Sequence, residues 1–453
     1  MTGLKRLSLC DAVERLRAGE LTSADYTAAL LTRTESLEKT IHAFAWLDRG
    51  HALSAARAAD ALRAAGTKLG RLHGVPIGVK DIFATAGIPT GMGSPAFDGF
   101  VPEKSAAMVV RAEAQGAFTF GKTVTAELAY FTPGPTRNPW NPAHTPGGSS
   151  MGSAAAVAAG MLPLAFGTQT NGSVIRPAAF CGCVGLKPSA GTLATAGIQP
   201  FSPTLDQPGL FTRSVEDMAL AFAALREGPD ELHAEAWPLP PLDRPPRLAA
   251  VRSPVWSQAE PAAQQSFAET LARLRAAGAP VTVVELPPAF GSAHDVHRTI
   301  MAYEAARNLG ELQSQQRVKL STVLNRFLDE GHTITAAAHA GALAQRQTLQ
   351  AGLGPFLAGF DAIVTPPTPG EAPATHEHTG DPVFCTIWTL IGVPALTLPV
   401  GFGPQGLPLG LQIVGTLGDD ARLLRVARWV EQALGFAPGI PEPVREALKI
   451  PSP

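Results

Sequence analysis

The sequence predicts an α/β protein in which helices and strands alternate along the chain. Residues 51–65, HALSAARAADALRAA, have the alanine-rich amphipathic pattern of a helix. The segment at 74–90, GVPIGVKDIFATAGIPT, is rich in β-forming residues and punctuated by Gly and Pro, as a buried strand and its loops are. Because alternating strands and helices form layered folds, we expect a sheet that is covered by helices.

The other elements follow in order. Residues 1–70 are expected to be helical, and Thr22 followed by Asp25 has the pattern of a capped helix start. After position 360 the chain returns to strand patterns and then ends with an amphipathic helix. These stretches are DAIVTPPTP (361–369), GVPALTLPV (392–400), LPLGLQIVGT (407–416) and DDARLLRVARWVEQALG (419–435). The chain contains no internal repeat and no long low-complexity linker, which favours one large domain.

The composition argues against a nucleic-acid-binding protein. Of the 453 residues, 45% are hydrophobic and 16% are charged, and 36 basic against 38 acidic side chains leave a formal net charge of −2. Nucleic-acid-binding domains concentrate positive charge, which this chain does not do. We expect a small neutral or weakly charged substrate and no nucleic-acid partner, and a homodimer is left open.

Cysteine usage and hydropathy predict a cytoplasmic protein. The chain has four cysteines, which form no CxxC pair and no disulfide framework: Cys10, Cys181, Cys183 and Cys385. This pattern is typical of a reduced compartment. Asp11 and Glu14 interrupt the N-terminus before a signal-like apolar core develops. The run at 154–167 is too short to span a bilayer and is broken by Pro163, so no membrane association is expected.

One stretch matches the sequence motif of a nucleotide-binding site, but its surroundings do not fit such a site. Residues 116–123, GAFTFGKT, match the P-loop pattern, but a helical pattern precedes them where a P-loop needs a strand. Phe118 and Phe120 occupy positions where a phosphate cradle needs small residues. The segment is therefore predicted to be a buried strand.

Two histidine pairs have spacings that metal ligands can have. They are His294 with His297, and His376 with His378. Neither pair has an obvious partner cluster, and a metal site needs three or four convergent ligands. We expect these histidines to be solvated and no metal to be bound.

A lysine at the end of the first predicted strand is a candidate base. Lys80 follows the apolar run GVPIGV, so it should be partly buried. Burial disfavours the ammonium and lowers the pKa of a lysine, which makes a neutral amine available. The alternative is an ion pair with the adjacent Asp81.

Two serine-containing turns could supply a nucleophile. Residues 144–160, HTPGGSSMGSAAAVAAG, place Ser149 and Ser150 after a glycine pair. Residues 167–177, GTQTNGSVIRP, place Ser173 after a turn whose backbone amides could converge on one point. Acyl transfer needs this combination of a nucleophile with donors for the developing oxyanion.

Taken together, these stretches resemble the amidase signature family of serine hydrolases. Its motifs GVPI-x-VKD, PGGSS-x-GSAAAVAAG, GT-x-T-x-GS and CG-x-VGLKPS stand here in order, and EDMALAFAAL and GVPALTLPVGF resemble later segments. The resemblance implies a single α/β/α layered domain with a central mixed sheet covered by helices. It would comprise a helical segment (1–70), a catalytic core (71–225), a variable, substrate-facing segment (226–360) and C-terminal core strands with a helix (361–453).

The resemblance also implies roles for individual residues. Ser173 would be the nucleophile, Ser149 a bridging serine after a non-proline cis peptide, and Lys80 the general base. Ser150 would hydrogen-bond Lys80. The oxyanion would be held by the backbone amides of Thr170, Asn171, Gly172 and Ser173. No metal or organic cofactor is required.

The sequence departs from the common family pattern next to the nucleophile. Gln169 stands where an aspartate is usual, Asn171 replaces the first glycine, and Arg176 comes three residues after Ser173 instead of two. This variant is similar to the malonamidase-like branch, in which the shifted arginine binds a substrate carboxylate. Arg176 is therefore either an anion anchor or an arginine paired inside the fold.

The sequence specifies the identity of the substrate less closely than the type of reaction. Tyr130 and Phe131, in a loop that is shorter than in many relatives, could shape an apolar acyl pocket or serve core packing.

The leading hypothesis is hydrolysis of a C–N bond in linear amides, with esters, anilides or carbamates as further substrates. The alternative is the glutamine-hydrolysing A subunit of a tRNA-dependent amidotransferase, against which Gln169 and Arg176 count. A catalytically silent binding protein is a third hypothesis, which the complete set Lys80, Ser149 and Ser173 opposes.

Overall fold

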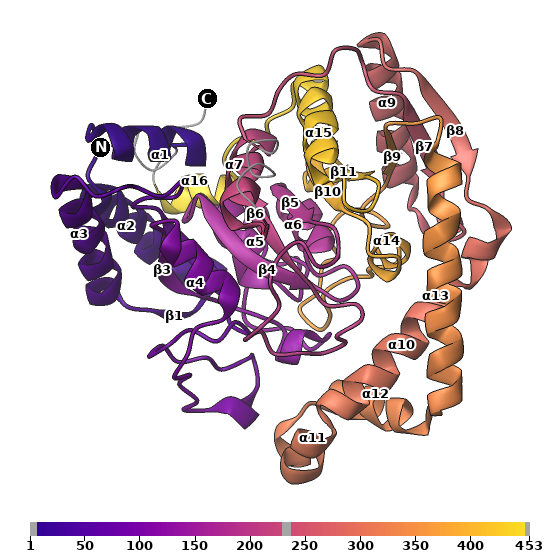
Figure 1. Ribbon diagram of the computed structural model, residues 1–453, viewed down its shortest axis with the longest axis horizontal. Coiled ribbons are helices and arrows are strands. Elements are labelled where there is room, and N and C mark those ends of the chain that lie inside the picture. The colour runs from indigo at the N-terminus through magenta and orange to yellow at the C-terminus, as the bar shows by residue number, and fades with distance from the viewer. Residues whose placement is uncertain (1–6, 229–236, 449–453) are drawn as a thin grey trace.

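A mixed sheet of 11 strands runs through the whole molecule, and helices cover it (Figure 1). The computed structural model describes residues 7–228 and 237–448. The strands are β1 (Phe44–Leu47), β2 (Pro76–Lys80), β3 (Phe118–Thr123), β4 (Leu164–Gln169), β5 (Val184–Lys187), β6 (Gln207–Thr212), β7 (Leu248–Arg252), β8 (Val281–Glu285), β9 (Ala362–Thr365), β10 (Ala395–Phe402) and β11 (Pro408–Val414). The predicted α/β fold with a central mixed sheet is thereby confirmed.

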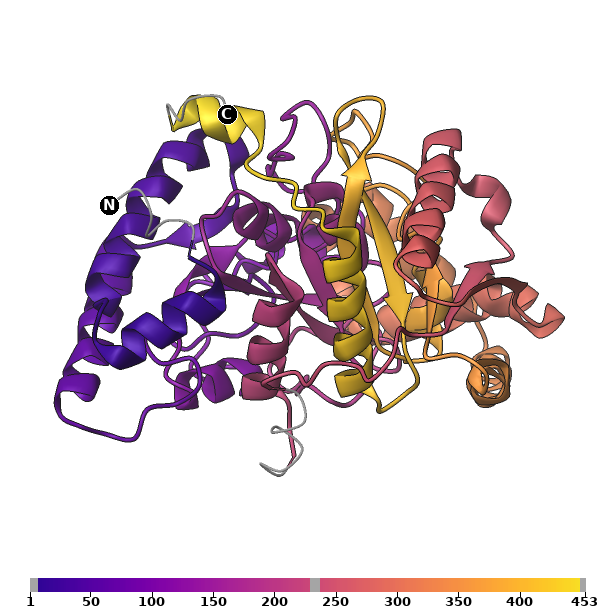
Figure 2. The ribbon, with the colours of Figure 1, turned by 90° about the horizontal axis from the view of Figure 1, so that it is seen from above.

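The strand order explains how distant motifs meet. It is β1-β3-β2-β4-β6-β5-β10-β11-β9-β7-β8. β2 pairs in parallel with both β3 and β4, whereas β6, β5, β10 and β11 pair antiparallel with one another in that order. The N-terminal segment therefore forms one end of the sheet and residues 248–285 form the other, as Figure 2 shows.

Helices lie on both faces of the sheet (Figure 2). Their bounds are α1 (Leu9–Ala18), α2 (Ser23–Ile41), α3 (Arg49–Ala64), α4 (Ala107–Ala114), α5 (Met151–Ala158), α6 (Ile175–Cys181), α7 (Val215–Leu225), α9 (Pro261–Ala276), α10 (Ala293–Asn308), α11 (Gly310–Gln316), α12 (Thr322–Thr333), α13 (Ala336–Leu357), α14 (Thr386–Leu390), α15 (Asp420–Leu434) and α16 (Glu442–Ala447). In the described part of the chain, no helix has the length and apolar character needed to cross a bilayer.

The N-terminal segment is not entirely helical, which corrects the expectation for residues 1–70. Helix α2 begins as predicted, with the Thr22 hydroxyl accepting from the Asp25 amide. Between α2 and α3, however, β1 forms the edge strand of the sheet against β3. Only four residues long, β1 is too short to show a period of its own, and its pairing with a distant strand creates it. Residues 1–6 lie outside the described residues.

The segment that matches the P-loop motif contains the strand β3. All six of its residues are buried, as the two phenylalanines indicated. Lys122, the lysine of the apparent motif, lies inside the fold and pairs with Asp81 at 3.1 Å. The structure therefore agrees with a buried strand at this position.

The alanine-rich stretch that follows the serine pair forms α5, and every residue of it except Ala158 is buried. Small side chains are needed because the helix lies very close to other backbone. A Cβ at Gly152 would stand 2.1 Å from the carbonyl oxygen of Ala43. The close packing of α5 holds the preceding serine turn against the sheet.

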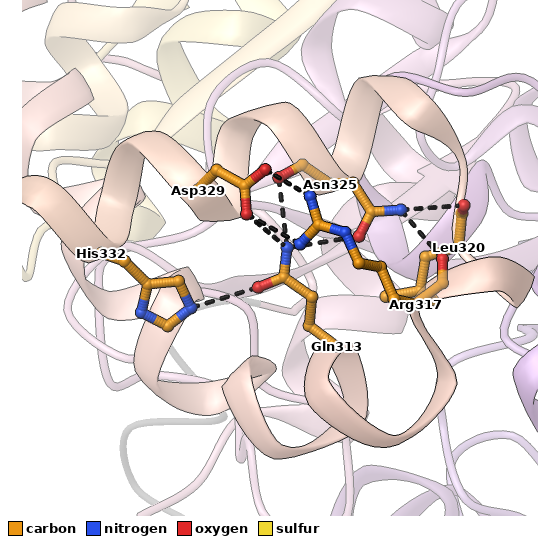
Figure 3. A network of polar contacts seen from close by, with 6 residues as sticks. All are labelled: Gln313, Arg317, Leu320, Asn325, Asp329 and His332. Carbon is orange, nitrogen blue, oxygen red and sulfur yellow. Dashed lines mark hydrogen bonds and ion pairs between the residues drawn. The ribbon is translucent and has the colours of Figure 1, made fainter.

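The segment 226–360 contributes a group of helices, α10 to α13, beside the sheet (Figure 1). Residues 229–236 of it lie outside the described part. Figure 3 shows the network that joins α11 to α12: Gln313 donates to Asn325 and Asp329, and Arg317 pairs with Asp329 at 2.5 Å. His332 contacts Gln313 at 3.1 Å. These contacts stabilise the turn between α11 and α12.

Candidate active site

Lys80 lies at the carboxyl end of β2 and is fully buried. Its Nζ donates to Ser149 Oγ at 2.8 Å and to Thr168 Oγ1 at 2.7 Å. Burial lowers the pKa of Lys80 well below its usual 10.5, and the nearby Asp206 carboxylate opposes that shift. A lysine in this environment is readily neutral and can act as a base.

Asp81 is not the partner of Lys80. Its Oδ1 lies 3.1 Å from Lys122 Nζ on the neighbouring strand, and its Oδ2 accepts from the Gly91 amide at 2.9 Å. Asp81 is the first residue after β2, and its carboxylate is directed to Lys122 and the Gly91 amide instead of to Lys80. The ion pair considered from the sequence is therefore formed by another lysine.

The serine turn has the backbone form that the family resemblance implied. The peptide bond between Gly148 and Ser149 is cis. Gly147 has a positive φ of 81°, and a Cβ there would stand 2.7 Å from Pro177 Cα. Only glycine fits a position with that backbone angle and that close approach.

Ser150 does not contact Lys80, which corrects the expected hydrogen bond. Its Oγ donates to the Thr168 carbonyl at 3.2 Å and accepts from the Thr168 amide at 3.3 Å. Thr168 in turn accepts from Lys80. Sequence reasoning missed Thr168, although it stands in the same motif as Gln169. Its relation to Lys80 arises because β2 and β4 are parallel neighbours whose carboxyl ends meet.

The segment from Thr170 to Ser173 connects β4 to α6 as an open loop. Gln169 holds the start of α6, since its Oε1 accepts from the amides of Val174 at 2.8 Å and Ile175 at 3.0 Å. Within the described ranges, no hydrogen bond uses the N–H of Asn171, Gly172 or Ser173. These N–H groups are thus available to a ligand, as an oxyanion hole requires.

Ser173 is buried in the wall of a small cavity, with 7% of its surface exposed. Its carbonyl accepts from the Ser150 amide at 3.4 Å, which ties the two serine turns together. Among the hydrogen bonds of the described residues, none joins Ser173 Oγ to Ser149 Oγ. Such catalytic hydrogen bonds often tighten only when substrate is bound.

Aromatic side chains surround the space in front of Ser173. Tyr130 and Phe131 both line this cavity, which encloses about 20 Å³. Tyr130 stacks on Phe201 at 5.4 Å and on Phe327 of α12 at 4.6 Å between ring centroids. A second cavity of about 110 Å³ shares Phe201 as a wall and contains Asp206. Both cavities have apolar and polar walls: the first also includes Asn171 and Arg176, and the second includes Thr168 and Asp206.

Arg176 is engaged inside the protein. Its guanidinium donates to the carbonyls of Gly380 and Gly148, both at 2.7 Å, and to Thr379 Oγ1 at 3.0 Å. Burial lowers the pKa of Arg176 to about 10. The side chain also lies over the ring of Phe131, 5.6 Å from its centroid. Of the two interpretations offered by the sequence, this geometry favours an arginine paired within the fold.

His297 is not a solvated residue, in contrast to the expectation. It is 2% exposed on α10, and its Nε2 lies 2.8 Å from the carbonyl oxygen of Thr170. His294, one turn earlier, lies 2.9 Å from the Val383 carbonyl. The sequence offered no signal for these contacts, since α10 belongs to the segment without recognisable motifs. No group of three or more His, Cys, Asp or Glu side chains that could bind a metal occurs in 7–228 and 237–448.

The fold is that of known amide C–N hydrolases. The Amidase family matches residues 25–424. The chain is 34% identical to the A subunit of glutamyl-tRNA(Gln) amidotransferase from Anaeromyxobacter dehalogenans, over 97% of this chain and 99% of that protein. This chain therefore belongs to the amidase signature family.

Solved structures agree with this assignment. A crystal structure described as an amidase superposes with a TM-score of 0.85 at 32% identity and covers 94% of this chain and 99% of its own. The native peptide amidase from Stenotrophomonas maltophilia superposes with a TM-score of 0.81 at 30% identity, over 96% and 99% of the two chains. Both likenesses extend through the segment 226–360.

Proposed function

We propose that this protein hydrolyses the C–N bond of a small amide through an acyl-enzyme on Ser173, with a proton relay through Ser149 to Lys80. The observation that carries the proposal is the buried Lys80 amine, 2.8 Å from Ser149 Oγ. Its environment favours the neutral form, so the amine can take up a proton.

The relay moves one proton at each step. The Ser173 hydroxyl gives its proton to Ser149 as its oxygen bonds to the substrate carbonyl carbon, and Ser149 gives its own proton to Lys80. The reverse transfer protonates the leaving amine as the C–N bond breaks, which leaves Ser173 acylated. Water then attacks the acyl group through the same relay, releases the carboxylic acid and restores Ser173.

The loop before Ser173 is suited to the negative charge that develops on the carbonyl oxygen. The N–H groups of Asn171, Gly172 and Ser173 have no partner among the described residues. Donors that are already oriented stabilise the tetrahedral intermediate without reorganisation at the moment of reaction. The loop therefore supports acyl transfer from a planar carbonyl.

The cavities favour an uncharged substrate. In the space at Ser173, the side chains of Tyr130, Phe131 and Met301 form a wall that suits an apolar group. Arg176 also lines this cavity, and its Nε has no hydrogen-bond partner among the described residues. Its other two nitrogens already make three hydrogen bonds to protein atoms, which argues against a dedicated carboxylate anchor. We propose small neutral amides as the main substrates, with esters, anilides and carbamates cleaved by the same route.

The second candidate is a glutamine-hydrolysing A subunit of a tRNA-dependent amidotransferase. It is favoured by the similarity to the Anaeromyxobacter dehalogenans protein, which has that description. Gln169 in place of the usual aspartate and the shifted Arg176 count against it. We therefore place the free-standing amidase first.

Labelling with a fluorophosphonate tests the proposal. The intact mass of the purified chain should rise by one adduct, and peptide mapping should locate it on Ser173. Ser173→Ala should take up no label, and Lys80→Ala should label much more slowly. No adduct, or one on Ser149 or Ser150, would contradict the mechanism.

A substrate panel separates the two candidate functions. The purified chain alone should release ammonia from small neutral amides faster than from glutamine. Preferential hydrolysis of glutamine, together with co-purification of a second protein from the native host, would favour the amidotransferase.

A further inference from the structure

We propose that His297, on helix α10 outside the recognisable motifs, is a positioning residue of the oxyanion hole that sets the direction of the Asn171 N–H. The inference rests on the proposed function. It adds a residue from the variable segment that does not contact the reacting atoms and acts through the backbone.

The contact determines which imidazole nitrogen carries the proton. His297 Nε2 lies 2.8 Å from the carbonyl oxygen of Thr170. A carbonyl oxygen can only accept, so Nε2 must be the donor. Thr170 is also held through its side chain, which donates to Asp206 Oδ1 at 2.5 Å. The carbonyl and the hydroxyl of Thr170 are therefore both anchored.

Holding this carbonyl also holds the next amide. The Thr170 carbonyl and the Asn171 N–H belong to one peptide unit, which is trans and planar, so they point in opposite directions. The plane cannot rotate toward or away from the substrate unless the His297 hydrogen bond is broken. The hydrogen bond to the carbonyl also polarises the peptide and strengthens its N–H as a donor.

The following peptide is held in the same manner from a different helix. Thr389 Oγ1 of α14 donates to the Asn171 carbonyl at 2.5 Å, which orients the Gly172 N–H. Two successive peptides of the loop are thus fixed on their carbonyl sides, while their N–H sides have no partner in 7–228 and 237–448. This repeated arrangement indicates that the carbonyl contacts serve the direction of the amides.

The environment of His297 keeps it a neutral donor. Burial lowers its pKa to about 4, and the nearby His294 acts in the same direction. The Thr170 carbonyl acts against the shift, since it favours the protonated ring. A neutral imidazole donates to Thr170 without adding a positive charge beside the loop.

The test compares two variants whose side chains at position 297 are similar in length but differ in whether they carry an N–H donor. His297→Gln keeps an N–H that reaches Thr170, whereas His297→Met removes it. Hydrolysis of p-nitrophenyl acetate gives kcat and KM, and a fluorophosphonate gives the labelling rate of Ser173. His294→Met is the matched control, because it removes a similar imidazole–carbonyl hydrogen bond from the same helix.

We expect His297→Met to lower kcat on the order of 100-fold, the loss typical of one oxyanion donor, with KM changed less than about threefold. His297→Gln should stay within about fivefold of the wild type, and His294→Met should be unaffected. The pH dependence of the rate should not shift in any of them, since the hydrogen bond of His297 goes to the Thr170 carbonyl rather than to the Lys80 relay. Thr389→Val should lower kcat in the same way, which makes the test independent of whether His297→Met folds.

Several results would overturn the inference. One is a His297→Gln variant as slow as His297→Met, because packing would then be the cause. Another is an equal loss in His294→Met, which would indicate general damage to α10. Wild-type rates in both His297→Met and Thr389→Val would also refute it. A wild-type protein that neither labels nor hydrolyses the ester would overturn the proposed function, and this inference with it.

Discussion

Lys80 Nζ and Ser149 Oγ lie 2.8 Å apart at the centre of the site, although 69 positions separate them in the chain. The second partner of the amine is the Thr168 hydroxyl, and no carboxylate in the described part of the chain forms an ion pair with it. Hydroxyl partners stabilise an ammonium less than a carboxylate does, so burial dominates. This relationship underlies the pH dependence expected of the enzyme.

Activity should rise with pH. In the proposed mechanism neutral Lys80 is the base, and burial holds its pKa well below 10.5, so the rate should increase as the ammonium loses its proton below that pH. The measurement is kcat/KM for a neutral amide between about pH 5 and 9, a range that covers a strongly lowered lysine pKa. Lys80→Ala should be slow and lack this titration. A flat profile for the wild type would exclude Lys80 as the base.

Thr168 should matter for the orientation of Lys80. Thr168→Val keeps the shape of the side chain but removes the hydroxyl 2.7 Å from Nζ, and we expect kcat/KM to fall about 10- to 100-fold, within the range of general-base effects. Thr168→Ser retains the hydroxyl and should stay close to the wild type. Equal activity of the Val and Ser variants would show that the contact is incidental.

Arg176 should stabilise the protein more than it binds substrate. Arg176→Lys cannot reach both carbonyls that the guanidinium now holds, and one unsatisfied buried carbonyl costs about 1–3 kcal/mol. We expect the free energy of unfolding, measured with urea, to decrease by that amount or more. Malonate should not compete with a neutral substrate. Competitive inhibition by malonate that disappears in Arg176→Lys would restore the anion-anchor interpretation.

His297 should make the protein sensitive to acid. Its pKa is about 4 in the fold against 6.5 ordinarily, so below pH 6.5 the unfolded chain takes up a proton that the folded chain does not. The folded state should lose up to about 3 kcal/mol of stability between pH 6.5 and 4 through this group. Urea unfolding of wild type and His297→Gln across that range isolates the effect.

The comparison of variants is needed because other groups titrate in the same window. Burial raises the pKa of Asp206 to about 6, which acts in the opposite direction, since the folded state then binds the extra proton. Asp206 is present in both proteins, so its contribution cancels in the difference. Parallel pH curves for wild type and His297→Gln would contradict the prediction.

Much of the site could be predicted from residue types and spacing. Lys80 after an apolar strand, and Ser149 and Ser173 after glycine-containing turns, carry their signals within a few residues. The same is true of the Thr22 helix cap and of the buried strand at 118–123. Such features depend on the local backbone and on side-chain chemistry, which short stretches of sequence determine.

The residues whose contacts differ from expectation share another property. Ser150, predicted to bond Lys80, contacts Thr168 instead, and His297, predicted to be solvated, holds Thr170. The strand β1 exists only because β3 lies beside it. In each case the deciding partner is remote in sequence, and no local pattern specifies which segment arrives there.

The sequence by itself thus determined the fold class and indicated the candidate nucleophile, relay and base. Tertiary structure alone decided the contacts around them: Thr168 with Lys80, Arg176 with the carbonyls of Gly148 and Gly380, and His297 with the carbonyl of Thr170. The physical reason is that a residue type limits which bonds a side chain can form. Which bond it does form depends on the groups that folding brings within about 3 Å of it.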